Sequence, residues 1–281
     1  MGECIQLQIP KEERQDSLAG LRKWSLERDD SGPYRVYRDK DSNPYYSVTT
    51  VLSHTAPEAK KRVLKKWLDK PGSEEQLELA CARGTLTHEH CEYVLKTANK
   101  IAINIGNSRN NWRTYDDGLA RVPKAITTSS IKKAIQNAPK VPFGARKYAK
   151  NLAAWIEENV AAIHASEFSL KHSAGMAGTA DALIDYGIKP GNLCIVDFKT
   201  SSARKDKPDE WLQDHLDQLG AYTSCLGESC NGLRPTMGVV VIARENGVQV
   251  REVSQLELLG ASQRFNERLE IFKAMVKLGA V

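Results

Sequence analysis

Apolar residues recur every three or four positions along several segments of the chain, which is the spacing of helices with one buried face. This spacing predicts helices at 57–70, 74–98, 129–138, 144–164, 209–226 and 254–278. Shorter runs rich in β-branched and apolar residues predict strands at 34–38, 167–172, 179–186, 193–200, 237–243 and 248–253. From the helix at 144–164 onward, the order is helix, three strands, helix, strand. This order predicts an α/β fold with a mixed central sheet flanked by helices.

The predicted strands lie mostly in the second half of the chain, whereas helices dominate the first half. We therefore expect residues 1–165 to form an N-terminal region with a helical cover, and residues 166–281 to form the core. The two parts are expected to make one compact unit. A length of 281 residues, with 41% hydrophobic and 27% charged residues, suits a large globular domain of this kind.

Two neighbouring predicted strands carry an informative set of charged residues. TADALIDY (179–186) and LCIVDFKT (193–200) are joined by GIKPGN, whose Gly and Pro predict a turn and hence a hairpin. Side chains alternate between the faces of a strand, so Asp197 and Lys199, two residues apart, point the same way. Asp181 on the adjacent strand can then share a metal ion with Asp197.

These residue types suit hydrolysis of a phosphodiester bond. Such a reaction needs an activated water, a cation near the non-bridging oxygens and a group that stabilises the leaving alkoxide. Carboxylates such as Asp181 and Asp197 are the ligands that Mg²⁺ prefers, and Lys199 supplies a positive donor for the water or the phosphate. Asp185 shares the face of Asp181 but lies near the turn, so we expect it to be solvated.

The spacing G-x-x-D, followed one hairpin later by D-x-K, resembles the PD-(D/E)XK nuclease superfamily. The matching residues here are Gly178, Asp181, Asp197 and Lys199. The resemblance implies a restriction-endonuclease-like core, to which the first half of the chain adds an N-terminal helical elaboration. It also implies a metal-dependent nuclease whose catalytic residues are Lys199, Asp197 and Asp181.

Two further segments resemble the RecB-like exonuclease branch of this superfamily. RGTLTHEHCEYVL (83–95) is similar to its helix G-x-x-x-H-x-x-x-E, here with Gly84, His88 and Glu92. DQLGAY (217–222) is similar to the Q-x-x-x-Y helix of the branch. The order of all these segments along the chain is the order of that branch.

The resemblance to this branch implies a role for each residue. The implied metal ligands, for Mg²⁺ or Mn²⁺, are His88, Asp181 and Asp197. Gln218 and Tyr222, four residues apart and so on one helical face, are expected to hold the DNA backbone. Two further candidates are Glu167, where the branch often has a glutamate, and Glu92, which could orient the imidazole of His88.

The segment YYSVTTVLSHTAP (45–57) resembles the opening of the mitochondrial genome maintenance exonuclease group and its phage relatives. This resemblance implies an exonuclease that hydrolyses DNA, prefers single strands or free ends, and works with replication or recombination proteins. Two alternatives stay open: a double-strand-specific recombination exonuclease, and a non-catalytic DNA-binding subunit that keeps the nuclease fold. Strandedness and polarity depend on the shape of the helical cover.

Charged and aromatic residues add some detail. The net charge of +5 is too small to identify a nucleic-acid-binding protein, but the basic run 199–207 begins at the candidate catalytic lysine and could guide a phosphate backbone. The candidate stacking platforms for single strands are Trp67, Trp112, Trp155 and Trp211. Most are expected in the core. Trp112, with Arg109 and Arg113, lies in a polar stretch that is interpreted as a DNA-contacting loop or a disordered linker.

The six cysteines lack the Cys-x-x-Cys spacing of zinc and iron–sulfur sites, so no iron–sulfur cluster is expected. They form no pattern typical of a disulfide framework, which favours reduced thiols in a cytosolic setting. The N-terminal segment is mixed in charge without a long apolar run, and no stretch approaches the ~20 apolar residues of a membrane span. We therefore expect a cytoplasmic protein, of a bacterial or phage-infected cell, without a membrane partner.

Overall fold

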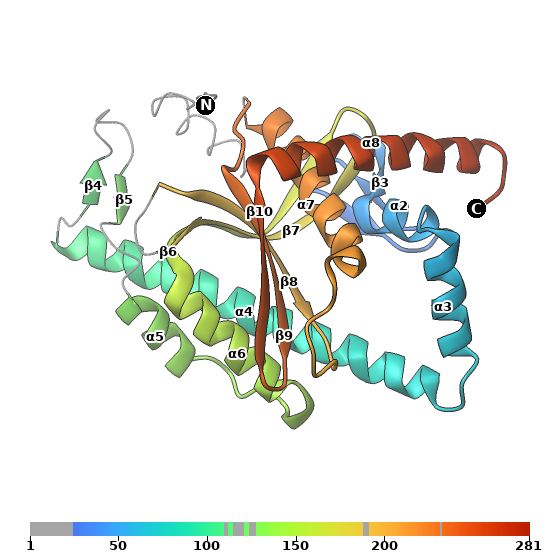
Figure 1. The fold of residues 1–281 in the computed structure, drawn as a ribbon. Helices are drawn as coiled ribbons and strands as arrows, with labels where there is room; N and C mark the ends of the chain where they lie inside the picture. Colours follow the sequence, from blue (N-terminus) through green and yellow to red (C-terminus); the bar gives the residue numbers. More distant parts are fainter. Residues whose placement is uncertain (1–24, 110–111, 115–120, 124–127, 188–190, 231) are drawn as a thin grey trace, which may run out of the picture.

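The computed structural model describes residues 25–109, 112–114, 121–123, 128–187, 191–230 and 232–281 (Figure 1). Within them, eight strands form one mixed sheet in the order β1-β2-β3-β7-β8-β9-β10, with β6 also paired to β7. Helices cover both faces of this sheet. The predicted α/β fold, with a mixed sheet between helices, is confirmed.

The second half of the chain supplies the centre of the sheet. Its strands are β6 (Val160–His172), β7 (Met176–Tyr186), β8 (Leu193–Thr200), β9 (Met237–Arg244) and β10 (Gly247–Ser254). β6, β7 and β8 pair antiparallel, whereas β8 and β9 run parallel because α7 (Asp209–Ser229) crosses between them. The predicted order of helix, three strands, helix and strand is confirmed, and β8 has the predicted bounds.

The N-terminal half adds strands to the same sheet. β1 (Glu27–Asp29), β2 (Val36–Arg38) and β3 (Pro44–Ser47) pair antiparallel in succession, and β3 then pairs parallel with β7. The sequence pattern predicts only the second of these strands, because three or four residues are too few to show a period of two. The N-terminal residues therefore contribute to the sheet as well as to its helical cover.

Two apolar layers hold the helices on the sheet. The helices on one face are α2 (Val48–His54), α7 and α8 (Gln255–Lys277). The helices on the other face are α4 (Ser73–Arg109), α5 (Thr128–Gln136) and α6 (Phe143–Asn159). Ile195 of β8 contributes to the first layer, whereas Val196 and Phe198 contribute to the second, which is the alternation of a strand buried on both faces. None of the described helices combines the length and apolar character that crossing a bilayer requires.

The boundary near residue 160 differs from the prediction. The pattern predicts a helix over 144–164, whereas α6 ends at Asn159 and β6 begins at Val160. Val160 has an extended backbone and pairs with Tyr186 of β7. The apolar residues that follow, such as Ile163, suit either element, and pairing with β7 decides in favour of the strand.

The polar stretch around Trp112 is also more regular than predicted. α4 continues to Arg109, and β4 (Trp112–Thr114) pairs antiparallel with β5 (Arg121–Pro123). The interpretation of Trp112 as part of a loop or a disordered linker is therefore wrong. Several neighbouring residues lie outside the described part of the chain, and DNA contact by this stretch stays a prediction.

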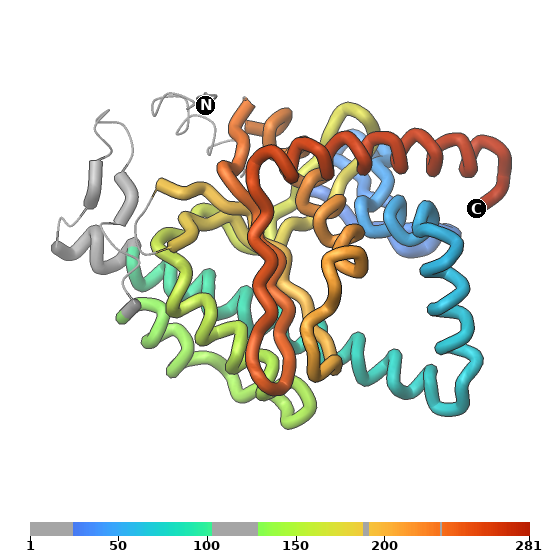
Figure 2. The backbone as a smooth tube through the Cα atoms, in the orientation of Figure 1, coloured from blue at the N-terminus to red at the C-terminus, as the bar shows by residue number. Residues whose placement is uncertain are grey.

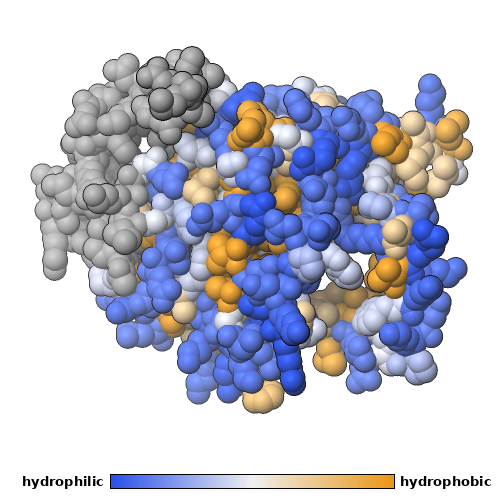
Figure 3. Space-filling view, in the orientation of Figure 1, coloured by the Kyte–Doolittle hydropathy of each residue, from blue (hydrophilic) through white to orange (hydrophobic). Residues whose placement is uncertain are grey.

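α3 (Glu58–Leu68) stands apart from both apolar layers. None of its residues is buried, and it joins α2 to the start of α4 along the outside of the molecule (Figure 2). The space-filling view shows the surface hollowed between α3 and the rest of the molecule (Figure 3). An ion pair between Lys60 and Asp214 ties the start of α3 to α7. We refer to residues 58–79, which comprise α3 and the first turns of α4, as the arch.

Candidate active site

The hairpin of β7 and β8 brings the predicted site residues together. The two strands pair antiparallel, and the backbone N–H of Phe198 donates to Asp181 Oδ2 at 2.6 Å. Asp197 and Lys199 lie beside this contact on β8, while Phe198 itself contributes to the apolar layer under α6. The predicted hairpin is confirmed, and so is the expected separation of Phe198 from its two charged neighbours.

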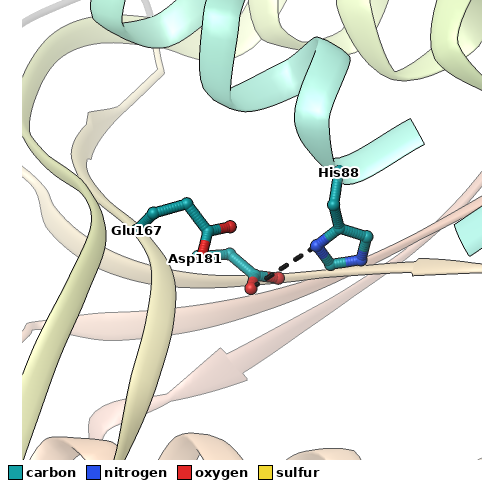
Figure 4. A group of neighbouring side chains, drawn as sticks. All are labelled: His88, Glu167 and Asp181. Carbon is teal, nitrogen blue, oxygen red and sulfur yellow. Dashed lines mark ion pairs between the residues drawn. The ribbon is translucent and has the colours of Figure 1, made fainter. Parts of the chain in front are cut away.

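Glu167 of β6 lies beside Asp181 of the hairpin. Its carboxylate, with His88 and Asp181, forms a group of candidate metal ligands whose ligand atoms all lie within 4.8 Å of one another (Figure 4). The φ angle of Glu167 is 47°, in the left-handed region that is unfavourable for a residue with a side chain. Backbone strain of this kind persists only where the surrounding structure holds it, and it clusters at functional sites.

His88 reaches the hairpin from α4, which contacts both β6 and β8. Its Nδ1 lies 3.6 Å from Asp181 Oδ1. Glu92, one turn later on α4, forms an ion pair with Lys96. Its predicted role as the partner that orients His88 therefore stays a prediction, whereas His88 itself stands in the ligand group.

Buried Asp197 and half-buried Lys199 form a charged pair beside this group. Lys199 Nζ donates to Asp197 Oδ1 at 2.5 Å and to the Phe198 carbonyl at 3.2 Å. The Asp197 side chain is 2% exposed. Its other oxygen, Oδ2, has no hydrogen-bond partner among the described residues. A buried carboxylate oxygen without a donor is costly, and a cation is one way to satisfy it.

Burial and the clustering of acids raise the pKa values of Glu167 and Asp197. Burial and the negative charges of Asp181 and Glu92 raise the pKa of Glu167 to about 8. Burial raises the pKa of Asp197 against the attraction of Lys199, and the charge of Asp181 adds to the increase. Burial alone would lower the pKa of Lys199, but the charges of Asp197 and Asp181 outweigh burial and raise it. The carboxylates therefore resist being ionised together unless a cation lies between them.

The donor set fits a divalent metal ion. Two carboxylates and an imidazole converge at His88, Glu167 and Asp181, and the unpartnered Asp197 Oδ2 lies on the next strand. Carboxylate oxygens are hard ligands that suit Mg²⁺ and Mn²⁺, and imidazole adds a nitrogen donor. Of the metal ligands expected from the sequence, His88 and Asp181 belong to the group of three, together with the further candidate Glu167. Asp197 lies outside this group, and its role as a ligand stays a prediction.

Gln218 and Tyr222 lie in the interior rather than on the surface. Both are buried in α7, and Gln218 Nε2 donates to the Tyr222 hydroxyl at 3.5 Å. A Cβ at Gly178 of β7 would lie 2.8 Å from Tyr222 Cε1, so the absence of a side chain at Gly178 makes room for this ring. Burial and the charge of Asp197 raise the pKa of Tyr222 well above its usual value. Their role in holding DNA stays a prediction.

His215 is a site residue that the sequence analysis did not single out. Its Nδ1 lies 3.7 Å from Asp197 Oδ2. Burial and the positive charge of Lys199 lower the pKa of His215 to about 3, so its imidazole is neutral at physiological pH. The signal that could have found it is its position three residues before Gln218, on the same face of α7.

Asp185 differs from its expectation. The pattern predicts a solvated carboxylate near the turn, whereas the Asp185 side chain is 3% exposed. Its Oδ1 lies 3.0 Å from His164 Nε2, and its Oδ2 accepts from the backbone N–H of Gly191 at 2.9 Å. β6, which carries His164, covers this end of β7, and that cover is not visible in the local pattern.

The fold and the candidate site are those expected of a nuclease family. The family model described as "PD-(D/E)XK nuclease superfamily" matches residues 60–275, and the chain therefore belongs to the PD-(D/E)XK nuclease superfamily. Members of this superfamily are nucleases, which typically use a divalent metal such as Mg²⁺ or Mn²⁺.

Other comparisons add little to this assignment. Among solved structures, the chain is similar to one described as "Crystal structure of SSO0001", with 18% sequence identity and a TM-score of 0.24. The match covers 36% of this chain and 48% of the other, so the chain spans about half the length of that structure. The comparison with curated proteins finds no match.

Proposed function

We propose that this nuclease is a DNA exonuclease of the RecB-like branch, similar to the mitochondrial genome maintenance group, that prefers single strands or free ends. The observation that carries the proposal is the group of His88, Glu167 and Asp181 beside Asp197 and Lys199. A histidine on a helix that reaches the acids of the hairpin is the feature that the resemblance to this branch implies. The Q-x-x-x-Y spacing of Gln218 and Tyr222 on α7 supports the same branch.

The residues divide the chemistry between them. Mg²⁺ or Mn²⁺ would be held by His88, Glu167, Asp181 and the Asp197 oxygen that has no hydrogen-bond partner among the described residues. When bound, the metal ion would polarise the phosphate and lower the pKa of a water molecule. Lys199 keeps its proton, because the neighbouring carboxylates raise its pKa. Its ammonium is held in place by the Asp197 carboxylate and the Phe198 carbonyl. It therefore orients the attacking water or offsets charge on the phosphate without reorganisation.

The arch supports a preference for single strands or free ends. Its helix α3 has no buried side chain and carries five basic residues, of which Lys60 pairs with Asp214 and Lys61 with Glu58: Lys60, Lys61, Arg62, Lys65 and Lys66. The hollow beneath it lies on the side of the molecule where Lys60 meets α7, the helix that carries His215. Positive charge above a hollow attracts a phosphate backbone. A strand that must pass beneath a covering element enters most easily by its end.

The proposal is tested by digestion of end-labelled linear single-stranded, linear duplex and closed circular single-stranded DNA, with Mg²⁺, Mn²⁺ or EDTA. The wild type is compared with Asp197→Asn and Lys199→Ala, and with Asp41→Asn as a control in an exposed acid outside the site. We expect metal-dependent loss of linear single strands, survival of circles, strongly reduced activity of both site variants and full activity of the control.

Other outcomes lead to different functions. Faster degradation of linear duplex would favour a double-strand-specific recombination exonuclease. Cleavage of circles would show an endonuclease. Binding of DNA without cleavage in either metal would make the chain a non-catalytic DNA-binding subunit with a nuclease fold.

A further inference from the structure

One face of α7 forms a continuous stripe that leads from the interior to the surface. Trp211, His215, Gln218 and Tyr222 are spaced by four, three and four residues, so their side chains lie above one another on the helix. The inner residues belong to the site, because His215 faces Asp197 and Tyr222 is buried against Gly178. The stripe therefore connects the catalytic carboxylate to the outer end of α7.

Trp211 is the outer end of this stripe. Its side chain is 61% exposed, which is unusual for the largest apolar side chain. It lies one helical turn from His215, about 6 Å along the axis, and the imidazole of His215 lies 3.7 Å from Asp197. An exposed indole therefore stands one helical turn outward from His215, the residue of α7 that faces Asp197.

A cation lies just before this tryptophan. Gln249 of β10 holds the backbone of Lys207 with two hydrogen bonds of 2.8 Å, one from the Lys207 N–H and one to its carbonyl. The side chain of Lys207 is half-buried, and the ion pairs of the described residues include none for it. Burial and the positive charges of Lys60 and Lys199 lower its pKa. Because Lys60 pairs with Asp214 and Lys199 pairs with Asp197, Lys207 is the lysine of these three that is left to meet an anion.

Asp214, three residues after Trp211 on α7, pairs with Lys60 and Arg268 rather than with Lys207. Asp206 pairs with Arg244, and Asp209 pairs with Arg251. Glu210 is exposed and lies off the stripe, about 100° around the helix from Trp211. On the opposite face of α7, a separate groove is lined by Gln213 and Leu216 together with residues of β10 and α8. The indole does not line that groove and is free to meet a ligand that approaches the active site.

We propose that Trp211 and Lys207 form a nucleotide-binding subsite, in which the indole stacks on a base of single-stranded DNA and the lysine binds a phosphate next to the scissile one. Every base has an apolar face, so stacking holds a strand without reading its sequence. The subsite rests on the proposed function for the identity of its strand. It adds a second point of contact that keeps the strand in line with Asp197.

Binding in EDTA tests the subsite without cleavage. The affinity of the full chain for a labelled single-stranded oligonucleotide is measured by fluorescence anisotropy for wild type, Trp211→Ala and Trp211→Phe. Phe143→Ala is the matched control, because Phe143 is an 85% exposed aromatic at the start of α6. We expect Trp211→Ala to bind about 5- to 150-fold more weakly, the range for loss of one base stack. Trp211→Phe should regain part of the loss, and the control should bind like wild type.

Oligonucleotides with one abasic position at a time locate the contact. For wild type, one position should weaken binding most, and the same position should have no effect on Trp211→Ala. Lys207→Ala should reduce the dependence of binding on salt concentration by about one phosphate contact. Equal binding by Trp211→Ala and Phe143→Ala, or an abasic profile unchanged in Trp211→Ala, would overturn the subsite.

The two proposals fail in different experiments. If linear DNA survives in every metal but Trp211→Ala still weakens binding, the exonuclease function is wrong and the subsite stands. If the wild type degrades linear DNA and Trp211→Ala binds normally, the function stands and the subsite is wrong. If the wild type binds no single strand in EDTA, the subsite is wrong whatever the cleavage result.

Discussion

The contact between Gly178 and Tyr222 makes a sharp prediction about how the site is built. Replacing Gly178 with alanine would place a Cβ 2.8 Å from Tyr222 Cε1 and 2.9 Å from its hydroxyl oxygen. Ordinary contacts of this kind begin at 3.4 Å, so the overlap with Cε1 is 3.4 minus 2.8, or 0.6 Å. The Tyr222 side chain is 4% exposed and cannot swing into solvent to relieve it.

The sign of the effect follows from two opposing terms. Overpacking a tight interior costs about 1–3 kcal/mol. Gly178 does not have a positive φ, so alanine meets no backbone strain and regains about 0.4–1 kcal/mol by restricting the unfolded chain. Because the steric term is larger, we expect Gly178→Ala to lower the free energy of unfolding by about 1–2 kcal/mol.

Urea denaturation measures this change, with two further variants as controls. Gly144→Ala is the matched control, because a Cβ at Gly144 of α6 meets nothing within 4 Å, and it should be neutral or stabilising. Tyr222→Leu removes the clashing atoms, so Gly178→Ala should cost almost nothing in that background. An equal cost of Gly178→Ala in both backgrounds would refute the reasoning.

Three other predictions concern charge. Mg²⁺ or Mn²⁺ should raise the melting temperature of the wild type but not of Asp181→Asn, because a cation relieves repulsion between the carboxylates. Scanning fluorimetry tests this, with EDTA as the control. Equal shifts in the melting temperatures of the two proteins would count against the metal assignment. Lys199→Ala should lower kcat on linear single strands by about 10²–10³ with little change in KM, as measured in steady-state kinetics. A loss confined to KM would contradict that role. Hydrogen bonds from Ser254 and Arg251 lower the pKa of Glu257 to about 2 from 4.5, so its stabilisation is complete above pH 4.5 and is lost as the pH falls through 2. Melting temperatures of wild type and Glu257→Gln should therefore differ at neutral pH and converge near pH 2, and a gap that persists there would disprove the cause.

The local patterns were reliable where an element is long and periodic. The helices at α7 and α8, the hairpin of β7 and β8 and the strand β9 all follow from apolar spacing and turn residues. The G-x-x-D and D-x-K spacing predicts that Asp181, Asp197 and Lys199 lie close together, because it depends on one hairpin and on the alternation of a strand. These are relations between residues that are close in the chain.

The patterns failed where distant segments decide the structure. Val160 leaves the helix because it pairs with Tyr186, and Asp185 is buried because His164 of β6 lies against it. β1 and β3 are too short to be recognised by period, and they exist as partners of β2 and β7. Likewise, a large apolar residue such as Trp211 is expected in the core from its residue type, yet its position on α7 leaves it 61% exposed.

The amino-acid sequence by itself specifies the fold class, the order of the central elements and the candidate site residues Asp181, Asp197 and Lys199. These features depend on local hydrogen bonding and on side-chain alternation, which involve residues only a few positions apart. Tertiary packing alone decides which side chains converge on the metal site. Glu167 adopts a left-handed backbone in the middle of β6, and His88 arrives from a helix 93 residues before Asp181. Such convergence depends on how α4 and β6 pack on the hairpin, and no local period encodes that contact.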